Sequence, residues 1–229
     1  MNPPQLSEIL EMLKATKESH LVPIENEIPY SILHGYATQS DDNRWVLDRS
    51  GRIDLALMAV SLGAEIEQVV SHLNWKDFES FIARILREHN YECVESFRQV
   101  GNSDRKGMEI DVIGIRNRVI VSVDAKMWSI RGGKASALRA AAEKQAKRTH
   151  RLGSELSKLA EKVHNMQMGE YVMRPMVVTW LIEDVEIHDG VPVVPVFKFN
   201  SFLLNYAMFE DRLKSFTGIL GVQYNQTRL

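Results

Sequence analysis

The sequence of 229 residues has few of the features that mark membrane or disulfide-rich proteins. Cys93 is its only cysteine, which excludes an internal disulfide and a cysteine-rich zinc site. No apolar run approaches the roughly 20 residues needed to span a bilayer. Residues 1–5 lack the basic segment and apolar stretch of a secretory signal. We therefore expect no membrane partner and a cytoplasmic location.

Motifs for organic cofactors and for histidine-based metal sites are also missing. The seven histidines form no His-x-His or His-Glu-x-x-His pattern, which argues against a zinc site or a histidine-based nuclease. Gly132-Gly133 lacks the Gly-x-x-x-x-Gly-Lys-Ser/Thr frame of a phosphate-binding loop. We expect no small-molecule cofactor.

Charge is the informative part of the composition. The net charge is only −2, but residues 98–151 carry 13 Lys and Arg against 5 Asp and Glu, a net of +8, whereas residues 1–97 have a net of −8. A basic block in an otherwise acidic chain is typical of a binding surface for a polyanion. A solvated basic helix with acidic neighbours explains it equally well, so charge alone leaves both readings open.

Hydrophobic periodicity divides the chain into two expected parts. For residues 1–72 the pattern predicts helices over 5–19 and 52–72 and a short strand at 44–47 between them. Gly63 can divide the second helix in two. This pattern fits either a winged-helix-like module or a plain helical cap.

Residues 73–229 alternate between helical and strand patterns. The expected order is a helix to residue 89, then strands over 91–100, 108–115 and 118–126, the last two joined by a tight turn at Arg116-Asn117. There follow a helix over 134–165 that Gly153 can interrupt, strands over 176–182 and 191–197, and a helix over 202–216. This order predicts an α/β fold with a mixed β-sheet sandwiched by helices.

Charged side chains share a face at the ends of two of these apolar strands. Side chains alternate along a strand, so Asp111 and Glu109 point one way on the first strand, and Asp124 and Lys126 share a face on the second. Burying unpartnered charges costs several kcal/mol, so folding alone gives little reason for this placement. If the strands are neighbours, Asp111 and Asp124 converge on one metal, and oxygen ligands suit Mg²⁺, with Mn²⁺ as a substitute.

The pattern of Glu79 on a helix, Ile110-Asp111 after a glycine loop, and Val123-Asp124-Ala125-Lys126 resembles the PD-(D/E)xK nuclease core. The separations of 32 residues from Glu79 to Asp111 and 13 from Asp111 to Asp124 are similar to those of the Mrr-type restriction endonuclease and archaeal Holliday-junction resolvase branch. Three departures stand out: Asn90 replaces a glycine, Asp124 stands where many members carry Glu, and isoleucine precedes Asp111.

This resemblance implies a restriction-endonuclease-like αβββαβ core over 73–229 and a metal-dependent endonuclease acting on DNA. The implied catalytic residues are Glu79, Asp111, Asp124 and Lys126, and the implied metal ligands are Asp111, Asp124, Glu79 and the Ala125 carbonyl. Lys126 would orient the attacking water. Taken alone, Glu79 is more often a solvated helix acid.

The same resemblance places phosphate contacts on the helix after the active-site strand. The implied DNA-binding residues are Lys106, Lys134, Arg139, Lys144, Gln145, Lys147, Arg148 and Arg151, although a solvated face accounts for the charged ones as well. A restriction role, a repair or recombination role such as junction resolution, and a catalytically silent DNA-binding protein of the same fold remain open. A homodimer is expected, since cutting two strands is simplest with two symmetric sites.

Overall fold

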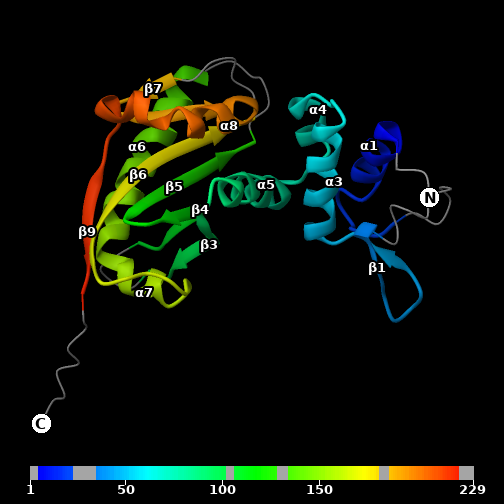
Figure 1. Ribbon diagram of the computed structural model, residues 1–229, viewed down its shortest axis with the longest axis horizontal. Coiled ribbons are helices and arrows are strands. Elements are labelled where there is room, and N and C mark those ends of the chain that lie inside the picture. Colours follow the sequence, from blue (N-terminus) through cyan, green and yellow to red (C-terminus); the bar gives the residue numbers. More distant parts are fainter. Residues whose placement is uncertain (1–4, 23–34, 102–105, 128–133, 181–185, 222–229) are drawn as a thin grey trace, which may run out of the picture. The chain divides into compact units, whose positions relative to one another are not determined.

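A computed structural model describes residues 5–22, 35–101, 106–127, 134–180 and 186–221. The chain forms two compact units, Met1–Arg84 and Ile85–Leu229 (Figure 1). The division falls within helix α5 (Trp75–Glu88), beyond the expected boundary at 72/73. In the described ranges no helix combines the length and apolarity required to cross a membrane.

The first unit consists of short helices and a two-stranded antiparallel sheet. Its elements are α1 (Leu6–Ala15), β1 (Thr38–Gln39), β2 (Trp45–Val46), α3 (Arg49–Ser61), α4 (Ile66–Ser71) and the first part of α5. The helix expected over 52–72 is two helices, so the break expected at Gly63 is confirmed. Gly63 separates them with φ +95°, a backbone conformation that residues with a side chain rarely adopt.

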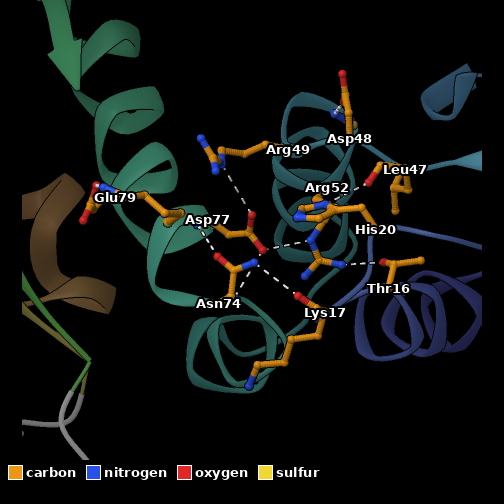
Figure 2. Close-up of polar contacts among 12 residues, drawn as sticks. Thr16, Lys17, His20, Leu47, Asp48, Arg49, Arg52, Asn74, Asp77 and Glu79 are labelled. Carbon is orange, nitrogen blue, oxygen red and sulfur yellow. Dashed lines mark hydrogen bonds and ion pairs between the residues drawn. The ribbon is translucent and has the colours of Figure 1, made fainter. Parts of the chain in front are cut away.

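A buried arginine holds the helices of this unit together (Figure 2). Arg52 of α3 is fully buried and its Nε donates to Asp77 Oδ2 of α5 at 2.8 Å. Its other nitrogens donate to the Leu13 carbonyl, to Thr16 Oγ1 and to the His72 carbonyl. Arg52 thus connects α1, α3, the end of α4 and α5 through one guanidinium group.

The second unit is built on a mixed seven-stranded sheet, so the α/β class with a helix-flanked mixed sheet is confirmed. The strands are β3 (Glu92–Gln99), β4 (Met108–Arg116), β5 (Val119–Lys126), β6 (Gly169–Thr179), β7 (Glu186–His188), β8 (Val191–Pro195) and β9 (Phe216–Leu220). The sheet order is β3-β4-β5-β6-β8-β7, and β9 also pairs with β6. Strand β4 is antiparallel to both of its neighbours, β3 and β5. Strands β5, β6 and β8 are parallel to one another, whereas β7 is antiparallel to β8 and β9 is antiparallel to β6.

Helix α6 (Lys134–Leu152) lies along one face of this sheet (Figure 1). Its apolar residues Leu138, Ala142 and Ala146 pack with Val177 of β6. After a 3-10 turn, η1 (Gly153–Glu155), helix α7 (Leu156–Ala160) packs Leu156 and Leu159 into a second hydrophobic cluster. On β4, a side chain at Gly114 would meet Leu86 and Tyr91, so the end of α5 adjoins this strand.

The expected C-terminal helix over 202–216 is wrong. The segment forms α8 (Val196–Leu204), the 3-10 helix η2 (Tyr206–Arg212) and strand β9. The strand pattern expected over 191–197 ends at Pro195, where α8 begins. β9 exists because it pairs with the first half of β6, a partner distant in sequence that local periodicity does not reveal.

Candidate active site

The regular pairing of β4 is interrupted at Asp111. On one side the ladder with β3 skips the position where Asp111 would face Ser96, which has φ +52°. On the other side the register with β5 ends at Val112–Val123, one position before Asp111 would face Asp124. Interruptions of this kind redirect side chains and are common next to active sites. Asp111 therefore lies where the sheet locally opens.

Asp124 of β5 is buried between two cations. Lys126 Nζ lies 2.7 Å from its Oδ2, and Arg148 NH1 of α6 lies 2.8 Å from its Oδ1. The Asp124 side chain is only 3% exposed, so these ion pairs offset most of the cost of removing the carboxylate from water. The carboxylate and the two cations come from residues on β5 and α6 that meet above one face of the sheet.

Asp111 reaches toward the same strand. Its Oδ2 accepts a hydrogen bond from the backbone N–H of Ala125 at 2.8 Å. Burial raises the pKa of Asp111 above its ordinary value of 3.8, and the nearby Asp124 carboxylate raises it further. The Ala125 N–H, Lys126 and Arg148 oppose this rise in the pKa. A cation between the two carboxylates would remove the repulsion.

Gln145 fixes α6 against β5. Its Nε2 donates to the Ser122 carbonyl and to Ser122 Oγ, both at 2.8 Å, and the side chain is fully buried. Its Oε1 is also buried and has no hydrogen-bond partner among the described residues. Gln145 was expected to contact DNA, but its side chain instead anchors the helix one turn before Arg148.

The donor set fits a hard divalent cation. Among the residues that the structure describes, no three His, Cys, Asp or Glu side chains gather closely enough to hold a metal. Mg²⁺ needs no such cage, because it is usually bound by one or two carboxylates together with water and substrate phosphate. Asp111 and Asp124 can supply those carboxylates, and the raised pKa of Asp111 marks a place where positive charge is favourable.

Glu79 lies on the part of α5 that belongs to the first unit. It is buried, and its Oε2 lies 2.7 Å from Lys76 Nζ, three residues earlier on the helix. The ion pair with Lys76 engages this carboxylate on its own helix.

The other basic residues expected to bind DNA fall into two groups. Lys106 is exposed, and Arg151 is half-buried with its NH1 donating to the Lys106 carbonyl. Three more lie exposed on α6, namely Arg139, Lys144 and Lys147. Lys134 begins α6, and its side chain lies outside the described residues.

The part of Arg148 in the carboxylate cluster was not predicted. The sequence contained one signal for it, since Gln145 and Arg148 are three residues apart and share a helix face that also contains buried residues. The contact with Asp124 depends on how α6 crosses β5, which the spacing does not give.

Comparison with known proteins identifies relatives of this chain. No family model matches it. A protein of Archaeoglobus fulgidus described as uncharacterized is 30% identical over 133 residues, which are 58% of this chain and 92% of the archaeal protein. The chain belongs to the family of this archaeal protein.

Among solved structures, the present chain is similar to the crystal structure of protein VC1899 from Vibrio cholerae. The match has 14% identity and a TM-score of 0.34, and it covers 90% of this chain and 51% of the Vibrio cholerae chain. The chain thus spans about half the length of that protein.

Proposed function

We propose that the second unit is a metal-dependent endonuclease of restriction-endonuclease-like fold that hydrolyses phosphodiester bonds in DNA, of the Mrr-like restriction type. One observation carries this proposal. Two carboxylates, Asp111 and Asp124, approach each other where β4 loses its pairing, and Lys126 stands on the second of them. A carboxylate pair with a neighbouring lysine is suited to holding a metal beside a phosphate.

The roles of the residues follow from their positions. Asp111 and Asp124 would hold Mg²⁺, with the Ala125 carbonyl as a further ligand. Bound there, Mg²⁺ would lower the pKa of a coordinated water and neutralise charge developing on the phosphate. Asp124 keeps the Lys126 ammonium at the edge of the site, at 2.7 Å.

The two cations have separate tasks in this proposal. Lys126 would donate a hydrogen bond to the attacking water and to a phosphate oxygen. Arg148 would hold Asp124 in place and add positive charge beside the phosphate, since its NH1 already lies 2.8 Å from Asp124.

The experiment is incubation of the full chain with linear, supercoiled and branched DNA, in Mg²⁺, Mn²⁺ or EDTA. We expect cleavage in Mg²⁺ and Mn²⁺ and none in EDTA. Conversion of supercoiled DNA directly to the linear form would support a homodimer with two sites. Absence of cleavage on all three substrates in both metals would contradict the proposal.

A catalytically silent DNA-binding protein is the second candidate, and one observation favours it. Both oxygens of Asp124 are engaged by Lys126 and Arg148, so the cluster is electrically compensated without a metal. In that case DNA binding would persist in EDTA and Mn²⁺ would not bind. Calorimetric titration with Mn²⁺ therefore separates the two candidates before any cleavage is measured.

A further inference from the structure

The second unit contains a basic hollow apart from the carboxylates. It has a volume of about 640 Å³, within the range of roughly 300–1,000 Å³ typical of small-ligand sites. It lies where the loop before β4, the end of α6 and the start of β9 meet. The hollow is lined by Lys106, His150, Arg151, Gly153, Ser154 and Thr217.

The chemistry of this lining is that of an anion site. Three of its residues carry basic side chains, two carry hydroxyls and none is a carboxylate. The neighbouring acid, Glu155, is already paired with Lys158 at 2.8 Å. The lining, as far as the structure describes it, therefore offers positive charge and hydrogen-bond donors and contains no acidic side chain.

Arg151 is held in place but incompletely bonded. Its NH1 donates to the Lys106 carbonyl, which fixes the guanidinium between the loop and the helix. Its Nε is buried and has no hydrogen-bond partner in the described part of the chain. A buried donor without a partner costs about 1–3 kcal/mol, so a site that supplies an acceptor is favoured. Phosphate oxygens are strong acceptors for a guanidinium group.

Two glycines stand where β9 meets η1, Gly153 in the lining of the hollow and Gly218 next to the lining residue Thr217. A side-chain carbon at Gly218 would lie 2.9 Å from the Gly153 Cα, and one at Gly153 would lie 2.9 Å from the Met173 side chain. The contact at Gly218 is with backbone, so a glycine there allows β9 and η1 to approach closely. Because of this close approach, Thr217 of β9 and Ser154 of η1 both line the hollow.

The hollow is near the carboxylate cluster along α6. Arg151 follows Arg148 by three residues, a rise of about 4.5 Å along the helix axis. The two arginines are thus about one helical turn apart, and Arg148 itself contacts Asp124 at 2.8 Å, so the hollow begins on the stretch of α6 that adjoins the carboxylates.

We propose that this hollow binds a phosphate group of a nucleic-acid strand, next to the phosphate at the carboxylates. The inference rests on the proposed nuclease function. Lys106 and Arg151 supply charge and guanidinium hydrogen bonds, and Ser154 and Thr217 supply hydroxyls. The hollow positions the strand and takes no part in the chemistry.

The test uses the metal-free, ¹⁵N-labelled full chain in EDTA, so that no cleavage occurs. Inorganic phosphate is titrated in one arm and a short DNA duplex in the other. We expect both to shift the amide signals of His150, Ser154 and Thr217. Arg151→Gln should weaken duplex binding by at least about tenfold and lower the log–log salt slope by about one. Lys162→Gln removes one charge from an exposed position outside the hollow and should change neither.

Lys106→Gln is the second variant, because its exposed side chain is not needed for folding. It should also lower the salt slope by about one. Unchanged duplex binding in both hollow variants would overturn the inference, and so would phosphate-induced shifts without duplex-induced shifts. If wild-type protein cuts DNA but the duplex does not shift the amide signals of the residues that line the hollow, this inference alone fails. If the hollow binds the duplex but no metal supports cleavage, the proposed function alone fails.

Discussion

Each unit of this protein buries an ion-pair cluster, and the two clusters are built differently. In the first unit one buried carboxylate, Asp77, pairs with the buried Arg52 at 2.8 Å and with the more exposed Arg49 at 3.9 Å, and the remaining Arg52 nitrogens bind carbonyls and a hydroxyl. In the second unit two carboxylates share one region with Lys126 and Arg148. The first arrangement connects helices, whereas the second keeps two like charges close together.

The difference shows how a buried charge that serves folding differs from one available for chemistry. Arg52 has partners on three other helical segments, and the carboxylate it meets, Asp77, faces cations. Asp111 accepts a hydrogen bond from the Ala125 N–H, and its pKa is raised by burial and by the neighbouring carboxylate of Asp124. Folding alone does not require this second arrangement, which is why we place the metal site there.

The largest expected effect is the loss of unfolding free energy when Arg52 is removed from the first cluster. Arg52→Ala leaves the buried Asp77 with only the longer contact to Arg49 at 3.9 Å, and loss of one partner of a buried pair costs about 3–5 kcal/mol of unfolding free energy. Arg44→Ala is the control in the same unit, because its pair with Asp42 is exposed and contributes about 0–1 kcal/mol. Denaturant titration measures both. Equal losses in the two variants would contradict a structural role for Arg52.

The next largest effect is expected on the cleavage rate of a variant that still folds. Lys126→Ala should lower the single-turnover cleavage rate by about 10²–10³-fold, since the lysine acts on the water and the phosphate. Arg148 still pairs with Asp124 and the lysine is partly exposed, so the loss of stability should be smaller than for Arg52→Ala. Lys162→Gln serves as the charge-loss control. Wild-type cleavage by Lys126→Ala would remove the lysine from the mechanism.

Sequence patterns predicted those features of the carboxylate cluster that depend on neighbouring residues in the chain. The strands carrying Asp111 and Asp124 were expected within a residue or two of their bounds, because alternating apolar residues and the Asn117 turn mark them. Asn117 has φ +54°, a conformation that asparagine tolerates. The break after the long helix was also expected at Gly153, where the 3-10 turn begins.

The non-local part could not be predicted. The interruption at Asp111 results from pairing with strands on both sides, and the Arg148–Asp124 pair results from the crossing of α6 over β5. β9 was missed for the same reason, because its pairing with β6 joins segments far apart in sequence. These features depend on tertiary contacts, which override local propensity.

A pH titration of stability sharpens the comparison at Asp111. The pKa of Asp111 is raised on folding, so its ionised form destabilises the folded state, and this loss develops as pH rises from the ordinary value of 3.8 through the folded pKa. Asp111→Asn keeps an acceptor for the Ala125 N–H and removes the charge. In EDTA we expect this variant to be more stable than wild type at neutral pH, with the gap closing as pH falls. A gap that widens toward low pH would contradict the sign of the shift.

The smallest effect concerns Cys93 on β3, the single cysteine. Burial raises the pKa of its thiol to about 12, so in the folded protein the reactive thiolate is scarce at pH 8. Labelling should be slow in wild type and fast after denaturation. In Arg52→Ala, slow labelling should persist, because Arg52 stabilises the other unit. Rapid labelling would show that the two units unfold together.

Calorimetric titration with Mn²⁺, paired with cleavage assays, tests the central claim most directly. Wild-type protein should bind Mn²⁺ and cut DNA. Asp111→Asn should remain folded in EDTA yet bind no Mn²⁺ and lose cleavage. If Asp111→Asn cuts DNA at the wild-type rate, with contaminating nuclease excluded, the carboxylate pair is not the active site.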